Sequence, residues 1–136
     1  PNILVEDAVV FDFSSNASVI YYINYMMELY KITDYGTPQL MTDGIDNTIC
    51  KTDNAGNSVL YYSEYNQETG KGTLVLRTGN STSTIAKDVH FERANETLDT
   101  IRYYKNVSGS IGAFTGDLYS NVNGKETLIS QGNYFS

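Results

Sequence analysis

The sequence predicts an all-β fold built from three copies of a four-stranded antiparallel unit. The first observation is a hydrophobic segment ending in two tyrosines, which occurs three times along the 136 residues. The second is a set of Gly- and Asn-rich turns that recur in the same order around each copy. The third is the composition, with twelve Tyr and no Trp, because aromatic and β-branched side chains favour strands. We expect a single domain over residues 1–136, which is long enough for one sizeable core.

The Tyr-Tyr segments define the length of the repeat. They are 40 and 42 positions apart, at residues 19–22, 59–62 and 101–104. A period of this size is typical of repeat architectures, in which each unit buries its hydrophobic surface against its neighbours. The predicted units are residues 8–45, 48–89 and 90–132. Residues 3–7 match the last strand of a preceding unit and are predicted to be an orphan strand.

Each unit is predicted to hold four short strands. In the first unit they are residues 9–13, 19–22, 29–32 and 39–42. In the second they are residues 48–52, 59–62, 74–77 and 84–87. In the third they are residues 89–93, 101–104, 118–121 and 127–130, and residues 133–135 are expected to begin a strand of a later unit. The turns between them are rich in Asn and Gly, which tolerate the positive φ of tight hairpins. Polar turns at Asp43-Gly44, Asp88 and Gln131-Gly132 follow the fourth strands.

Residues 18–32 also fit an amphipathic helix. Val19, Ile23 and Met27 fall at helical spacing, and Ser18 stands where an N-cap residue would be. The corresponding segments of the other two units are interrupted by glycines, which disfavour a helix interior. We therefore predict a pair of strands here, as in the other units.

The second strand of the first unit is apolar on both faces. Side chains alternate along a strand, so Ile20 and Tyr22 point one way while Tyr21 and Ile23 point the other. A sheet with one wet face would alternate apolar and polar residues, so this sheet is predicted to be covered on both sides. Radially stacked four-stranded units form a β-propeller, which typically has about four to eight blades. Three predicted blades therefore imply a partial ring, completed by missing blades or by a second chain in a homodimer, or else an open arc.

The Tyr-Tyr pattern resembles repeats of known proteins. Residues 58–62, 72–74 and 85–89 match best, and the likeness extends over nearly the whole chain. The pattern resembles the extracytoplasmic, β-propeller-like Tyr-Tyr repeats of surface or membrane-anchored proteins of clostridial bacteria. The resemblance implies a propeller-like fold outside the cytoplasm, at the cell surface or secreted, with no established enzymatic role.

Charge and hydropathy exclude several classes of partner. The net charge of −7 and the absence of a Lys/Arg cluster disfavour nucleic acid and anionic membrane surfaces. No apolar run approaches the length of about 20 residues that spans a bilayer, so no direct membrane insertion is expected in this segment. Cys50 is the only cysteine, which excludes an internal disulfide.

The sequence contains no recognisable catalytic or metal site. His90, the only histidine, lies in a predicted strand, where a structural role is expected, because catalytic groups tend to lie on loops. One Cys and one His cannot supply the four ligands of a structural zinc site. The Asp- and Asn-rich residues 43–47 and 53–57 are interpreted as turns rather than calcium loops. We expect no cofactor. Acidic residues near predicted loops are interpreted as solvated charges: Asp43, Glu64, Glu68 and Asp88.

Binding is predicted on the loops between the second and third strands, which differ most between the units. Variable loops on a rigid scaffold commonly carry binding residues. The apolar candidates there are Tyr25, Met26, Tyr65 and Phe114. The alternative is that these side chains pack under their own loops.

Three functions are compatible with these features. The first is a non-catalytic binding or scaffolding module that recognises a protein or a glycan through these loops. The second is a purely structural spacer or assembly repeat. The third is a glycan-active enzyme on a propeller scaffold, which would need a convergent pair of carboxylates.

Overall fold

The protein is an all-β molecule, as predicted. The computed structural model describes residues 7–136, and the regular structure in this range consists entirely of strands. The strands are β1 (Ala8–Phe13), β2 (Val19–Asn24), β3 (Leu29–Thr33), β4 (Gln39–Thr42), β5 (Cys50–Thr52), β6 (Ser58–Asn66), β7 (Lys71–Thr78), β8 (Ser81–Ala94), β9 (Thr100–Ser110), β10 (Ala113–Val122) and β11 (Lys125–Phe135). Residues 7–136 therefore hold no helix that could cross a membrane. The predicted orphan strand 3–7 lies, apart from Asp7, outside the described residues.

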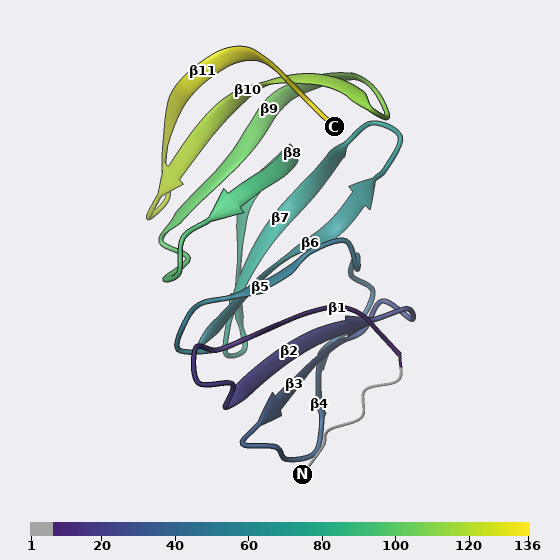
Figure 1. Ribbon diagram of the computed structural model, residues 1–136, viewed down its shortest axis with the longest axis vertical. Helices are drawn as coiled ribbons and strands as arrows, with labels where there is room; N and C mark the ends of the chain where they lie inside the picture. Colours follow the sequence, from purple (N-terminus) through teal and green to yellow (C-terminus); the bar gives the residue numbers. More distant parts are fainter. Residues whose placement is uncertain (1–6) are drawn as a thin grey trace.

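The strands form two antiparallel sheets. The first has the order β1-β2-β3-β4, and the second has the order β11-β10-β9-β8-β7-β6-β5. Within each sheet every strand pairs with its neighbour in the chain, so both sheets are simple meanders. In Figure 1 the strands fan out from β4 at the lower end to β11 at the upper end.

Strand β8 is shared by two sets of strands. Its residues 81–89 pair with β7, and its residues 90–94 pair with β9. At Asp88, where we predicted a turn, the chain instead continues as a strand with a φ of 57°. The hydrogen bonds therefore join seven strands into one sheet, where the repeat pattern predicts two separate sheets of four.

The turns that open each unit share one hydrogen-bond pattern. The amides of Ser14, Asp53 and Asn95 donate to the carbonyls of Val19, Ser58 and Thr100. The amides of Ala17, Gly56 and Leu98 donate back to the first residue of each turn, and all three of these residues have positive φ. These turns are 39 and 42 positions apart, so Tyr22, Tyr61 and Tyr103 are equivalent. The first Tyr-Tyr pair is thus displaced by one residue from the 40-residue spacing that the sequence suggests.

Residues 19–33 form a hairpin, as predicted, and not a helix. Strands β2 and β3 are paired from Val19–Thr33 to Ile23–Leu29. The side chain of Asn24 closes the turn, because its Oδ1 accepts hydrogen bonds from the amides of Met26 (3.1 Å) and Glu28 (2.9 Å). A polar side chain that satisfies local amides stabilises the turn in place of a helical first turn.

Two hydrophobic clusters hold the sheets together. The first lies between the four-stranded sheet and β5–β7, and it contains Tyr21, Ile23, Leu29, Val59 and Tyr61. The second lies between β6–β8 and β9–β10. It includes Leu60, Tyr62, Leu74, Ile101 and Tyr103. Strands β2 and β6 thus carry apolar residues on both faces, and β6 contributes to both clusters.

Two long hairpins lie where we predicted variable loops between the second and third strands. Strands β6 and β7 are joined by residues 67–70 alone, and β9 and β10 by residues 111–112. Residues 133–135 do not begin a new strand, because they continue β11 and pair with residues 114–116 of β10. The ring of Phe135 then stacks on that of Tyr104, with centroids 4.1 Å apart.

Candidate functional site

One edge of the molecule gathers the hairpin turns on which we predicted binding. The β2–β3, β6–β7 and β9–β10 turns all point to the right-hand side of Figure 1. The bend at Asp88 belongs to the same edge, because Asp88 lines a pocket together with residues beside the β6–β7 turn. We call this side of the molecule the loop edge.

A polar pocket of about 330 Å³ opens at the loop edge. We call it the loop-edge pocket, and its lining residues are Glu64, Tyr65, Asn66, Thr69, Lys71, Gly72 and Asp88. Asn66 shapes the adjoining turn, because its Oδ1 accepts the amide of Glu68 (2.9 Å) and its carbonyl accepts the amide of Gly70 (2.8 Å). The residues that line this hollow carry two carboxylates, an ammonium, a carboxamide, a hydroxyl and a tyrosine ring.

The backbone at Asp88 differs from that of its counterparts. Gly44 and Gly132 are 44 residues before and after it, and they have φ values of 64° and 65° at the bends that follow β4 and that interrupt β11. Asp88 adopts nearly the same conformation, with φ of 57°. Glycine enters this region without steric cost, whereas Asp does so at some cost in energy. The second unit therefore places a carboxylate where the other two units have no side chain.

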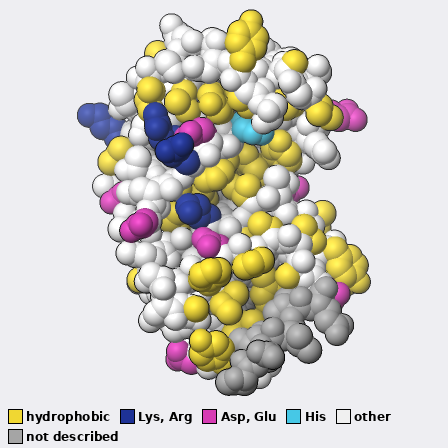
Figure 2. Space-filling view, viewed as in Figure 1, with side chains coloured by type: hydrophobic (Ala, Val, Ile, Leu, Met, Phe, Trp, Pro, Cys, Tyr) yellow, Lys and Arg dark blue, Asp and Glu magenta, His cyan; other side chains and the backbone are white. Residues whose placement is uncertain are grey.

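An aromatic cluster packs beside this pocket. The ring of His90 lies 4.7 Å from Phe135, 6.0 Å from Tyr65 and 6.1 Å from Phe114 between centroids. His90 Nδ1 is 2.9 Å from the carbonyl oxygen of Gly70. A carbonyl only accepts, so Nδ1 carries the proton in this bond. In Figure 2 the histidine (cyan) lies among hydrophobic side chains over the region of β8.

The lower face of Tyr65 rests on a buried tyrosine. The rings of Tyr62 and Tyr65 stack with centroids 4.7 Å apart. The hydroxyl of Tyr62 accepts a 2.8 Å hydrogen bond from the amide of Phe91. Burial raises the pKa of both tyrosines, so both are neutral hydroxyl donors and acceptors near neutral pH. Tyr65 is thus held rigidly and remains partly exposed toward the pocket.

The structure separates the four predicted binding residues into two pairs. Tyr65 and Phe114 lie on strands β6 and β10 rather than on loops, and both belong to the aromatic cluster around His90. Phe114 is only 4% exposed. Tyr25 and Met26 lie on the β2–β3 turn and are 62% and 60% exposed. Only Tyr65 among the four lines the loop-edge pocket.

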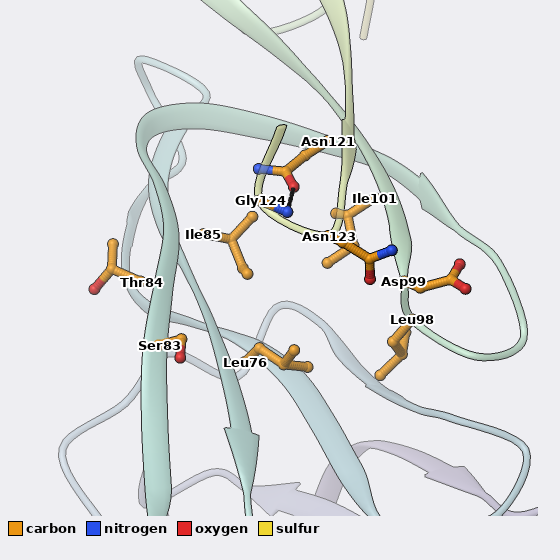
Figure 3. A pocket seen from close by; sticks show the side chains of 10 residues that line it. All are labelled: Leu76, Ser83, Thr84, Ile85, Leu98, Asp99, Ile101, Asn121, Asn123 and Gly124. Atoms are coloured by element: carbon orange, nitrogen blue, oxygen red, sulfur yellow. Dashed lines mark hydrogen bonds between the residues drawn. The ribbon is translucent and has the colours of Figure 1, made fainter. Parts of the chain in front are cut away.

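Two further hollows open away from the loop edge. The larger, of about 340 Å³, lies between β7–β8 and the turns that precede β9 and β11 (Figure 3). Asp99 and Asn123 line it, and Asn121 closes its turn by accepting the amide of Gly124. The smaller, of about 250 Å³, lies where the opening turns of the three units meet. It includes Lys51 and Glu96.

The groups that nucleophilic or metal chemistry would use are not brought together in the described part of the chain. Cys50 is buried in the first hydrophobic cluster, and burial raises the pKa of its thiol to about 12. His90 lies in the aromatic cluster instead. Among residues 7–136, no three His, Cys, Asp or Glu side chains are grouped in a way that could hold a metal ion.

Sequence reasoning treated Glu64 and Asp88 as separate solvated charges, and the structure brings both to one pocket. They are 24 positions apart, on β6 and β8, and the pairing of both strands with β7 makes them neighbours. One signal was present in the sequence. Asp88 occupies a bend at which the neighbouring units carry glycine, Gly44 and Gly132.

Comparison with known proteins gives a likeness in fold only. No protein-family model and no curated protein matches the chain. Among solved structures, the chain resembles part of a GH74 enzyme from Niastella koreensis, with a TM-score of 0.60 and 18% sequence identity. The match covers 97% of this chain and 19% of that enzyme, so the chain spans about a fifth of the enzyme's length. The GH74 family is a β-propeller family.

Proposed function

We propose that this chain is a non-catalytic binding module of the β-propeller type that recognises a glycan through the loop-edge pocket. The observation that carries the proposal is that Glu64, Tyr65, Lys71 and Asp88 line one polar hollow. Pockets of a few hundred Å³ with a small number of converging polar groups are the usual form of a ligand site.

The propeller interpretation rests on the shared geometry of the three units. Strands β1–β4, β5 to the first half of β8, and the second half of β8 to β11 are each a set of four antiparallel strands. The same opening turn begins each set. The likeness to part of an enzyme from a β-propeller family supports three consecutive blades. We accordingly propose units that correspond to residues 8–45, 48–89 and 90–132.

The chemistry of the pocket suits a hydroxyl-rich ligand. Carboxylates accept hydrogen bonds from hydroxyl groups, and such charge-assisted bonds are about twice as strong as neutral ones. Glu64 and Asp88 offer acceptors, while Lys71 and Asn66 offer donors. Tyr65 supplies a rigid ring with a polar tip, because Tyr62 supports it from below. A sugar presents both hydroxyl donors and an apolar ring face to such a set.

The proposed place of action is the cell surface or the secreted fraction of a bacterium. This proposal rests on the resemblance of the Tyr-Tyr segments to clostridial extracytoplasmic repeats. A polar sugar polymer or glycoprotein in that compartment is a ligand consistent with an acidic protein, since the net charge of −7 disfavours anionic polymers.

Substitution of Asp88 provides the sharpest test. In Asp88→Gly the bend keeps the conformation that Gly44 and Gly132 adopt, while the pocket loses one carboxylate. We expect the fold to be as stable or more stable, and affinity for a bound sugar to fall roughly tenfold or more, the effect of losing one charge-assisted hydrogen bond. The probes are N-acetylglucosamine, cellulose and mannose oligosaccharides, titrated into the 15N-labelled chain by NMR.

The matched control is Asp99→Asn, which changes a carboxylate at the other large hollow. It should leave binding unchanged. Equal binding by Asp88→Gly and the native chain, or no chemical-shift change with any probe, would contradict a glycan site at the loop edge and would favour a spacer. Release of reducing ends from a probe would contradict the non-catalytic assignment and favour an enzyme.

A further inference from the structure

Hydrogen bonds from backbone and side-chain donors cross the joint between the four-stranded sheet and the next set of strands. The amide of Ser15 donates to the carbonyl of Asn54 at 2.9 Å. The hydroxyl of Tyr21 donates to the carbonyl of Gly56 at 2.9 Å. The amide of Thr52 donates to Oδ2 of Asp12 at 2.9 Å. Among residues 7–136 no strand pairing crosses this joint, so these contacts and the apolar cluster between the sheets hold it together.

The next joint repeats part of this arrangement at equivalent positions, which lie 39 residues further along the chain on one side of the joint and 42 residues further on the other. The amide of Asn54 donates to the carbonyl of Glu96 at 2.7 Å, as Ser15 does to Asn54. Leu60 stands at the position of Tyr21, and Leu98 stands at that of Gly56. Both leucines lie in the second hydrophobic cluster, so an apolar contact replaces the hydrogen bond.

The cross-strand pairs that fill these joints are also equivalent. Ile23 pairs with Leu29, and Tyr62 pairs with Leu74. All four are buried, the first pair in the first joint and the second pair in the second joint. The third pair, Tyr104 with Leu118, is only partly buried. It lies on the face of the third set of strands that is turned away from the second set, which we call the last sheet face.

The last sheet face also carries an unsatisfied donor. Arg102 is the third-unit counterpart of Tyr21 and Leu60. Its Nε is buried and has no hydrogen-bond partner among residues 7–136. A buried donor without a partner is unfavourable, because it has lost its hydrogen bonds to water. Arg102 therefore occupies the position at which Tyr21, in the first unit, donates a hydrogen bond across a joint to the backbone carbonyl of Gly56.

We call the face of the first sheet that is turned away from the second sheet the first sheet face; it is apolar, and several of its side chains are exposed among residues 7–136. Phe11, Phe13 and Leu40 are 59%, 52% and 50% exposed, and they lie on the face turned away from the second sheet. Tyr22 and Tyr30 stack on the same face with centroids 5.2 Å apart. Figure 2 shows hydrophobic side chains gathered over this lower end of the molecule. Soluble proteins seldom leave a sheet face of this composition uncovered.

We propose that a second copy of this chain docks head to tail, with its first sheet face covering the last sheet face of the first copy. The guanidinium of Arg102 then donates to the carbonyl of Ala17 of the second copy, the counterpart of Gly56. The amide of Glu96 donates to the carbonyl of Ser15 of the second copy and extends the line of turns. Tyr104 and Leu118 then lie against the first sheet face of the second copy, on which Phe11 and Leu40 are exposed.

One further contact follows from the same correspondence. Arg93 is the counterpart of Asp12, and Phe13 is the counterpart of Thr52. The Arg93 side chain, 69% exposed, therefore lies over the exposed ring of Phe13 of the second copy. Arginine over an aromatic face is a favourable cation–π pair. The two ends of one chain thus carry complementary groups, cations at one and aromatic rings at the other.

A head-to-tail contact either closes into a ring or continues as a filament. Two copies of three units give six, which falls within the usual range of about four to eight blades in a closed propeller. The same contact made twice then covers both open faces of both copies. The proposal rests on the geometry of the joints and is independent of the glycan site at the loop edge.

The first test is the mass of the 136-residue chain in solution, by light scattering coupled to size exclusion. We expect twice the 15.1 kDa of one chain at micromolar concentration. Phe13→Lys places a cation opposite Arg93 and should yield a folded monomer, because Phe13 is already half exposed. Ile111→Lys is the matched control, since Ile111 is 62% exposed on the β9–β10 turn, and it should remain dimeric.

The second test does not depend on a destabilising variant. A Ser15→Cys chain is mixed with a Glu96→Cys chain under mild oxidation, and a disulfide between the two chains is expected. A Ser15→Cys, Asn54→Cys double variant should form the corresponding disulfide within one chain, because these turns are hydrogen-bonded in the structure. A native monomer up to millimolar concentration without cross-linking would overturn the second copy as the occupant, and open polymers would overturn the closed pair.

Discussion

The hydroxyl of Tyr21, on β2, donates a 2.9 Å hydrogen bond to the backbone carbonyl of Gly56, in the turn between β5 and β6. Tyr21 belongs to the first sheet and Gly56 to a turn of the second set of strands, 35 positions further along the chain. The bond is buried, and burial together with the nearby charge of Asp53 raises the pKa of Tyr21. Tyr21 is therefore a neutral donor that fixes how the first sheet meets the second.

Removing this hydroxyl should weaken the protein. We expect Tyr21→Phe to lower the free energy of unfolding by about 1–3 kcal/mol, because the Gly56 carbonyl is left buried without its donor. Urea denaturation followed by circular dichroism measures the change. Tyr35→Phe, at a tyrosine that is 57% exposed, is the control and should change stability by less than about 0.5 kcal/mol. Equal stability of the two variants would show that the bond contributes nothing.

Gly56 should tolerate no side chain. A Cβ there would lie 2.6 Å from the Cβ of Val19, and its φ of 77° disfavours any L-residue. We expect Gly56→Ala to be destabilising by about 2–5 kcal/mol, the sum of backbone strain and overpacking. Gly44→Ala is the control, because Gly44 has φ of 64° and no atom within 4 Å of such a Cβ. Gly44→Ala should lose only the stability that backbone strain costs, about 1–2 kcal/mol. An equal loss of stability in both variants would contradict the close contact between Gly56 and Val19.

Cys50 should be unreactive in the folded protein. Its thiol is buried, and burial followed by the charge of Asp12 raises its pKa to about 12, so almost no thiolate is present at pH 8. With Ellman's reagent at pH 8, the native chain should release less than a tenth of the colour that the urea-unfolded chain releases in the same time. Rapid stoichiometric reaction of the native chain would contradict a closed first joint.

Acid should weaken the fold partly through Glu126. Hydrogen bonds from the hydroxyl of Tyr103 and from Lys105 hold the pKa of Glu126 below its ordinary value of 4.5. A carboxyl with a lowered pKa stabilises the fold above the unfolded pKa, and this stabilisation is lost as the pH falls through the folded pKa. Between pH 6 and pH 3, the native chain should therefore lose more stability than Glu126→Gln, by less than about 1 kcal/mol for this partly exposed group. Identical losses would contradict the lowered pKa.

The strands of the fold could be predicted from the sequence, because hydrophobic patterning marks each one. The apolar residues within 18–32 fall at helical spacing, yet these residues form the hairpin of β2 and β3. Comparison with the glycine-interrupted segments of the other two units correctly predicted a pair of strands. The extent of the hairpins could not be predicted. Gly70 and Gly112 occupy turns of a few residues, whereas Gly109 lies within β9 itself, so a run of glycines does not show where a strand ends.

The candidate site could be predicted only in part. Tyr65 was recognised as an aromatic group near a turn, and it lines the loop-edge pocket. Glu64 and Asp88 were identified as acidic residues near loops, but they were not predicted to line the same pocket. Their proximity depends on how β6, β7 and β8 pair. Phe114 was expected near a loop surface, but it is buried against His90, because β9 and β10 extend past the predicted ends of their strands.

The continuity of β8 divides the molecule into parts of unequal cooperativity. Strand β8 pairs with β7 through residues 81–89 and with β9 through residues 90–94, so the second and third sets of strands share this strand and cannot separate without breaking one of its pairings. The four-stranded sheet is attached by side chains and a turn instead. Local opening in proteins follows such boundaries. The amides of β2 and β3 should therefore exchange with solvent as one early unit, while those of β7 and β9 exchange only on global unfolding.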